Sequence, residues 1–254
     1  MADRKLTVIT YHAVDDRGDI ISVTPARFRR QMKLLGTHGY RGVSLKEAFN
    51  CLEQNGTFPE NTVVLTFDDA YHCVYSNALP CLEEFGFGAT VFVPTAFVGM
   101  GEGDARQTNA HLGRDMMDWR QIKEKADHGI EIGAHTRSHP DLRKLDPEAL
   151  EDELGGCRRE LEDRLGAGVN SFAYPYGYWN ERIKMATGQH FRHACTTQLG
   201  HNRPGVDPLR IRRLDAYYLG RDSTLVRTAA GGMAPWWVFR QFLRDLRARV
   251  EPGR

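Results

Sequence analysis

VVLTFDDAYH, residues 63–72, decides the fold: apolar and β-branched residues run directly into two adjacent carboxylates, Asp68 and Asp69. Short continuous apolar runs are typical of strands that are covered on both faces. Similar runs recur along the chain and alternate with longer amphipathic segments. This alternation predicts a parallel α/β architecture, in which chemistry gathers at the C-terminal ends of the strands. The two aspartates are expected at such an end.

The same patterns place the other elements. Strands are expected over 6–12, 62–69, 89–95, 130–136, 171–177, 191–197 and 209–218. Helices are expected over 24–40, 44–56, 76–86, 117–129, 146–166 and 180–189, with a kink at Pro80 in the third. The stretch 97–115 is polar, glycine-rich and without periodicity, which indicates a long loop and a candidate lid.

Composition excludes several classes of protein. The chain has 254 residues, which suits one large domain or at most two. Its formal charge of +1 gives no indication of nucleic-acid binding. Its five cysteines form no CxxC pair, which favours reduced thiols. The N-terminus lacks the apolar core of a signal peptide, and no run approaches the ~18 apolar residues of a membrane span. We therefore expect a cytoplasmic chain, unless a leader has been removed. No feature predicts an oligomeric state.

The end of the chain differs in character from the rest. We expect a domain over 1–225 and an amphipathic helical extension over 226–254. PWWVFRQFLRDLRARV, residues 235–250, is aromatic and basic. This pattern favours packing on the domain or on a partner, with contact to a membrane surface as the alternative.

A second polar cluster follows another expected strand. GAHTRSHPD, residues 133–141, places His135 and His139 four residues apart. On one helical turn, side chains at i and i+4 share a face, so both imidazoles could bind one metal ion. An aspartate from a neighbouring strand end would complete a site with open coordination positions, as hydrolytic zinc or non-haem iron requires. Taken alone, the paired aspartates are also compatible with a solvated turn or a helix cap.

Three motifs in this order resemble a known family. TFDDA (66–70), HTRSH (135–139) and FAYPYG (172–177) are similar to the first three motifs of the polysaccharide deacetylases, the NodB-homology domains of carbohydrate esterase family 4. The resemblance covers roughly residues 5–220 and implies a distorted, incomplete (β/α) barrel. It also implies removal of N-acetyl groups from an amino sugar in a glycan or glycoconjugate, with a divalent metal. Zn²⁺ is favoured, and Co²⁺, Ni²⁺ and Fe²⁺ are alternatives.

The resemblance assigns roles to the matching positions. Asp68 falls on the catalytic base, and Asp69, His135 and His139 fall on the metal ligands. The division of labour that the resemblance implies would explain why two carboxylates stand together, since one would bind a cation and the other would accept a proton.

The third motif supplies the remaining contacts of the implied site. Tyr176 would offer its backbone N–H to the oxyanion, and Pro175 with Tyr176 would contact the substrate. By itself the Pro-Tyr-Gly turn is common, so its significance depends on the other two motifs.

The chain departs from the family pattern in three places. Ala70 replaces a usual glycine, and little effect is expected because alanine tolerates most geometry outside the left-handed region. Ala173 stands where an arginine often pairs with the base, and Arg213 is a candidate replacement. The usual C-terminal motif with the catalytic acid is missing after residue 201. VITYHAV (8–14) resembles that motif, as in circularly permuted members similar to the poly-N-acetylglucosamine deacetylases, and this makes His12 the candidate acid.

Other interpretations remain open. His12 could instead bond a loop carbonyl, and the acid would then be His193, His201 or a metal-bound water. The chain could also be a related metal-dependent amidase or O-deacetylase on a non-polymeric substrate, or a carbohydrate-binding relative without activity.

Overall fold

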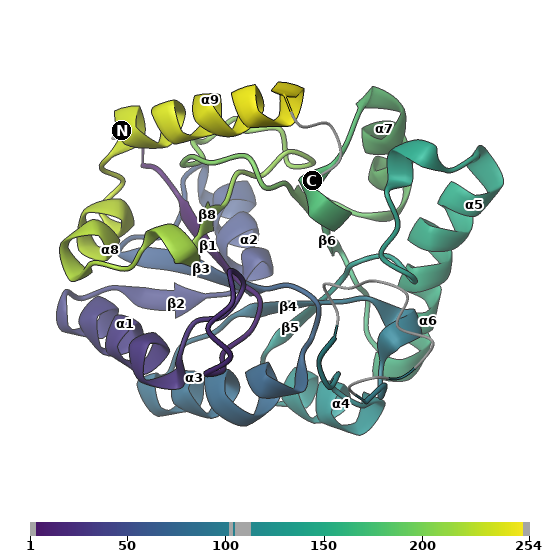
Figure 1. Cartoon of the computed structure of the whole chain (residues 1–254), viewed down its shortest axis with the longest axis horizontal. Helices are drawn as coiled ribbons and strands as arrows, with labels where there is room; N and C mark the ends of the chain where they lie inside the picture. The colour runs from purple at the N-terminus through teal and green to yellow at the C-terminus, as the bar shows by residue number, and fades with distance from the viewer. Residues whose placement is uncertain (1–3, 102–103, 105–112, 251–254) are drawn as a thin grey trace.

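The structure is a computed structural model that describes residues 4–101, 104 and 113–250, with side chains up to 246. The described strands are β1 Thr7–Tyr11, β2 Arg41–Val43, β3 Thr62–Phe67, β4 Thr90–Val93, β5 Glu131–Ala134, β6 Ser171–Ala173, β7 His193–Cys195 and β8 Leu214–Asp215. The helices are α1 Pro25–Thr37, α2 Leu45–Asn55, α3 Leu79–Phe85, α4 Trp119–Asp127, α5 Pro147–Glu151, α6 Cys157–Leu165, α7 Glu181–His190, α8 Asp222–Ala229 and α9 Ala234–Val250. Figure 1 shows the helices arranged around a curled sheet.

All strand pairs of the sheet are parallel. Their order is β7-β6-β5-β4-β3-β1-β8, and β2 pairs with β3 beside this path. The segment that leads into β8 also touches the opposite edge, through a bridge between Ile211 and Cys195. The fold is therefore the expected incomplete (β/α) barrel, and the carboxyl ends of its strands meet at one end.

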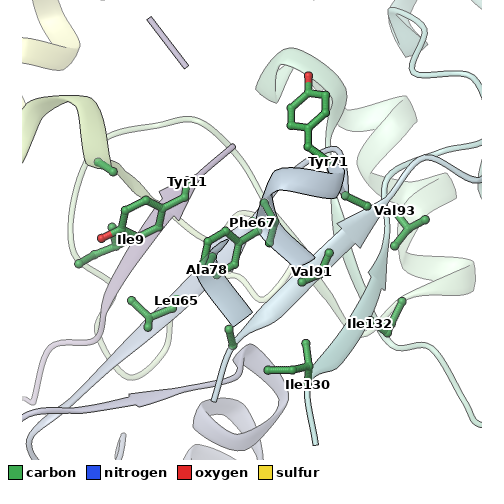
Figure 2. Packing of buried hydrophobic residues seen from close by; sticks show 14 of the residues in the cluster. Ile9, Tyr11, Leu65, Phe67, Tyr71, Ala78, Val91, Val93, Ile130 and Ile132 are labelled. Atoms are coloured by element: carbon green, nitrogen blue, oxygen red, sulfur yellow. The ribbon is translucent and has the colours of Figure 1, made fainter. Parts of the chain in front are cut away.

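Alternation along the strands builds two cores. Ile9, Leu65, Phe67 and Val91 belong to one cluster with buried residues of the surrounding helices. Figure 2 shows these four side chains on their strands. Residues of opposite parity, including Val8, Val64, Phe92 and Ile211, form a second cluster. A strand buried on both faces has no polar face to alternate with, which is why the sequence shows continuous apolar runs.

Several elements differ from their expected bounds. The strand expected over 171–177 ends at Ala173 and continues as a 3₁₀ turn, while the strand expected over 209–218 shortens to β8. The helix expected over 146–166 is interrupted by a π-helical turn, Asp152–Gly156. A π-helical turn, Val74–Ala78, leads without a break into α3, so Pro80 lies inside a continuous helical run, just after an irregular turn. The expected lid over 97–115 lies mostly outside the described residues.

The C-terminal helix packs on the barrel. Trp237 of α9 is buried, and the Leu199 N–H donates to Gln241 Oε1 at 2.8 Å. The opposite side of α9 exposes Phe239 and Phe242. Among the helices that the structure describes, none combines the length and apolar character needed to cross a membrane. The division at residue 225 falls inside α8 and stays a prediction from the sequence.

Candidate active site

The two aspartates leave β3 beside the point where His12 leaves β1. Tyr11 pairs with Phe67 in the parallel register, so the next residues, His12 and Asp68, are neighbours. The Asp68 N–H donates to the Tyr11 carbonyl oxygen at 3.0 Å. The chain then turns sharply, because Asp69 has a φ of 71°. The turn gives the two carboxylates different partners.

Ala70 continues this turn and corrects one expectation. Its φ is 51°, which lies in the left-handed region, so alanine is strained at this position. The left-handed conformation costs an L-residue about 1–2 kcal/mol. The Ala70 side chain is buried, and burial of one methyl group offsets about 0.8 kcal/mol of that cost.

Asp68 forms a buried ion pair with Arg213. The Arg213 Nη1 and Nη2 groups donate to Asp68 Oδ1 and Oδ2 at 2.6 and 2.8 Å. Arg213 Nε is fixed in turn by the Thr196 carbonyl oxygen at 2.9 Å. Burial alone would raise the pKa of Asp68, but the Arg213 charge and hydrogen bonds hold this pKa well below its ordinary value. Asp68 is therefore an ionised carboxylate with a fixed orientation.

Arg213 reaches the site from the segment before β8, whereas Ala173 ends β6. The Arg213 guanidinium also lies over the Phe92 ring, 5.8 Å from its centroid. His12 Nε2 lies 3.8 Å from Asp68 Oδ2, and the His12 side chain is 24% exposed. Asp68 thus has two basic neighbours, the buried guanidinium of Arg213 and an imidazole that solvent can reach.

Asp69, His135 and His139 converge as a group that could hold a metal ion. Their ligand atoms all lie within 4.8 Å of one another, and all three residues are buried. Asp69 Oδ1 is 3.5 Å from His135 Nε2 and 3.7 Å from His139 Nε2. His135 Nδ1 must donate to the Ala173 carbonyl oxygen at 2.7 Å, so its Nε2 carries the lone pair that a metal needs. Burial lowers the pKa of His135 to about 4, and His139 acts in the same direction, which keeps His135 neutral near pH 7.

The residues present fit a divalent cation. Ligand atoms about 2.1 Å from one ion lie about 3.0–3.4 Å apart at octahedral to tetrahedral angles, so the distances at Asp69 are only a few tenths of an ångström too wide. Within the described residues, buried Asp69 Oδ1 accepts no hydrogen bond. Burial raises the pKa of the Tyr71 hydroxyl, and its hydrogen bond to Asp69 raises this pKa further. Tyr71 therefore remains protonated and orients the carboxylate through that hydrogen bond.

The histidines are held by a loop, which corrects the expected helical turn. Residues 135–139 have no helical structure, and Thr136 and His139 have φ of 66° and 54°. The Thr136 hydroxyl accepts the His139 N–H at 2.9 Å. The sequence spacing predicted that the two imidazoles would meet on one face of a helical turn. They do meet, but the loop conformation brings them together, with its positive φ angles and the hydrogen bond to Thr136.

The third motif forms a tight turn beside His139. Tyr176 has φ 60° and ψ 0°, and its ring packs edge-on against the His139 ring, with centroids 4.6 Å apart. Gly177 has φ 72°, and a Cβ there would lie 2.1 Å from Thr197 Oγ1. Buried Pro175 begins the turn, directly after β6. The turn thus places the Tyr176 side chain next to His139.

The two alternative acids lie elsewhere. His201 Nδ1 is 3.0 Å from Thr7 Oγ1 at the start of β1, and its Nε2 bonds the Gly232 carbonyl. His193 begins β7 and packs against Phe49. Both are at the amino ends of strands, away from Asp68.

Sequence reasoning missed the supporting contacts of the site. The Ala173 carbonyl oxygen and the Tyr71 hydroxyl orient His135 and Asp69, and neither leaves a signal beyond proximity to a motif. Glu153, which contacts the loop from the π-helical turn, lies in a segment that the sequence presents as an ordinary helix.

Comparison with known families agrees with this geometry. The family described as polysaccharide deacetylase matches residues 55–192. This match covers more than half of the chain, so the chain belongs to the polysaccharide deacetylase family.

Two relatives show how far the similarity extends. YxkH of Bacillus subtilis, named as a polysaccharide deacetylase, is 31% identical over 77% of this chain and 66% of its own length. The poly-β-1,6-N-acetyl-D-glucosamine N-deacetylase of Staphylococcus aureus is 30% identical over 63% of this chain and 55% of its own length. The chain therefore spans between about half and two thirds of these relatives.

Solved structures share the fold. IcaB from Ammonifex degensii superposes with a TM-score of 0.72 at 26% identity, covering 89% of this chain and 96% of that chain. A polysaccharide deacetylase from Bacillus cereus gives a TM-score of 0.74 at 26% identity, over 89% and 69% of the two chains. The deacetylase PplD of Streptococcus pyogenes, in complex with acetate, gives a TM-score of 0.79 at 24% identity, covering 90% of this chain and 99% of that chain. At this identity the similarity shows a shared fold only.

Proposed function

We propose that this chain is a metal-dependent deacetylase that hydrolyses the N-acetyl groups of an acetylated amino sugar in a glycan. The observation that carries the proposal is the arrangement of two different carboxylates. Asp69 converges with His135 and His139, and Asp68 is held beside them as an ion pair with Arg213. A hydrolytic site needs both a cation to polarise the carbonyl and a base to accept a proton.

The metal site would be formed by Asp69, His135 and His139. Two imidazoles and one carboxylate suit Zn²⁺, and they also suit Co²⁺, Ni²⁺ and Fe²⁺. When bound, such an ion supplies Lewis acidity toward the amide carbonyl and makes water more acidic.

Asp68 is the proposed general base. Its low pKa keeps it ionised near neutral pH, and two hydrogen bonds from Arg213 fix the orientation of its carboxylate. A carboxylate with a low pKa is a weak base, so it can act only on a water that is more acidic than bulk water. This requirement explains why the base stands directly beside a cation site.

His12 is the proposed general acid, and Tyr176 the proposed oxyanion donor. Water adds its oxygen to the carbonyl carbon while Asp68 accepts the proton, and the developing oxyanion accepts a hydrogen bond from the Tyr176 N–H. The C–N bond then breaks as His12 gives a proton to the leaving nitrogen. The products are acetate and a free amino sugar. Pro175 and Tyr176 would contact the substrate from the turn.

The substrate is the least constrained part of the proposal. The relative from Staphylococcus aureus is named for poly-β-1,6-N-acetyl-D-glucosamine. A polymer of N-acetylglucosamine is therefore the first substrate to test, followed by lipid-linked and nucleotide-linked N-acetylated sugars.

The test is acetate release from this panel by the purified chain, with Asp68→Asn as the matched inactive control. We expect release by the wild type that a chelator abolishes and added metal restores. Absence of release from every N-acetylated sugar, with metal bound at one equivalent, would contradict the proposal.

A further inference from the structure

The loop that carries both histidines is held from outside the site by Glu153. Glu153 Oε2 accepts the backbone N–H groups of Arg137 and Ser138 at 2.8 and 2.9 Å. Glu153 Oε1 accepts the Ser138 hydroxyl. Both loop residues lie between His135 and His139 in the sequence, so one carboxylate fixes the chain that joins two metal ligands.

This loop needs an external partner because its backbone is strained. Thr136 and His139 both have positive φ, and a β-branched residue such as Thr136 rarely adopts this conformation. Such geometry persists only where surrounding contacts specify it. Inside the loop the Thr136 hydroxyl accepts the His139 N–H. From outside, the Thr95 and Ala96 N–H groups donate to the carbonyl oxygens of Thr136 and Arg137, and Glu153 is the side chain that accepts the loop N–H groups.

Glu153 stands on an irregular part of the helix layer. It belongs to the π-helical turn Asp152–Gly156, which separates α5 from α6. Its neighbour Leu154 is buried in the core, while Glu153 is half-buried against the loop. π-helical turns are rare and frequently mark functional sites.

We propose that Glu153 is a positioning residue of the metal site: it fixes the 135–139 loop so that His139 Nε2 stays directed at the position shared with Asp69 and His135. The inference rests on the metal site of the proposed function. Residues that orient metal ligands typically contribute 10–100-fold to metal affinity.

The test is the Zn²⁺ affinity of metal-free protein, measured by competition with a chelator well below the unfolding temperature. Glu153→Ala should bind Zn²⁺ about 10–100-fold more weakly than the wild type. Glu153→Gln should stay within about threefold, because an amide of the same length can keep all three contacts. Glu153→Asp keeps the negative charge, but its side chain is one methylene shorter and does not reach the loop. Its Zn²⁺ affinity should therefore be as low as that of Glu153→Ala.

Asp152 offers a matched control on the same turn. Its Oδ1 accepts the Arg137 side chain at 2.9 Å, and within the part of the chain that the structure describes it bonds no backbone group of the loop. Asp152→Ala should therefore bind Zn²⁺ within about twofold of the wild type. Circular dichroism of each metal-free variant shows whether it is folded.

The pattern across variants decides the inference. Wild-type affinity in folded Glu153→Asp would overturn it, and this variant also serves if Glu153→Ala does not fold. High Zn²⁺ affinity in Glu153→Asp together with low affinity in Glu153→Gln would show that charge decides the affinity, and would overturn the inference as well. If the wild type itself binds no Zn²⁺, the proposed function fails instead, which separates the two failures.

Discussion

Replacing Arg213 with methionine tests how the site holds an ionised carboxylate in its interior. Arg213 is 1% exposed and donates two hydrogen bonds to Asp68, which is 3% exposed. Methionine fills similar space without the charge, so Arg213→Met leaves Asp68 buried and unpaired. Removing one partner of a buried ion pair costs about 3–5 kcal/mol. We expect the free energy of unfolding of the metal-free protein to fall by that amount at pH 7.

The loss should depend on pH in a defined direction. In the wild type the pKa of Asp68 is lowered, so its contribution to stability is present above the unfolded value of about 3.9 and is lost as pH falls through the folded pKa. Without Arg213, burial raises this pKa above the unfolded value, and the variant loses stability as pH rises. The difference between the two proteins should therefore be larger at pH 7 than near pH 4.

The assay is urea unfolding followed by circular dichroism. Arg212→Met is the control, because Arg212 is exposed beside the buried arginine and should change stability by less than about 0.5 kcal/mol. Adding Asp68→Asn to Arg213→Met removes both charges and should recover about 1–3 kcal/mol. A loss below about 1 kcal/mol in Arg213→Met, or no recovery in the double variant, would refute the reasoning.

Three further substitutions test separate parts of the site. Asp68→Asn should retain metal and lose turnover, whereas Asp69→Asn should weaken metal binding; equal metal loss in both would contradict the division of roles. His12→Ala should keep the fold and the metal but lower kcat for amides by roughly 10²-fold, with a smaller drop for an activated ester, whose leaving group hardly needs a proton. Equal wild-type rates on both substrates would make His12 structural. Gly177→Ala should destabilise the chain by about 2–4 kcal/mol in urea unfolding, because its Cβ meets Thr197 at positive φ; unchanged stability would show that the turn can relax.

The order of strands and helices was predictable because periodicity is a local signal. The strand expected over 62–69 is β3, which ends at Phe67, and the helix expected over 24–40 is α1, which Thr24 caps by accepting the Arg27 N–H. The register of parallel strands then brings His12 beside Asp68. Short elements were harder to predict, since β2 and α8 have too few residues to show a clear hydrophobic period in the sequence.

The geometry of the site was less predictable because it depends on non-local contacts. Positive φ at Ala70 and Thr136 is imposed by surrounding structure and is opposed by the residue types themselves. Glu153 is 15–16 residues away in sequence from the loop residues that it bonds. Arg213 is 145 residues away from Asp68. A helical sequence pattern cannot reveal that the side chain of one of its polar residues, Glu153, accepts hydrogen bonds from the backbone of a separate loop.

The most direct test of the central claim measures metal content and acetate release on the same samples of wild type, His135→Ala and His139→Ala. The account predicts one equivalent of divalent metal and chelator-sensitive release in the wild type, with both lost together in each folded variant. Full metal content and turnover in both variants would place the site elsewhere and contradict the account.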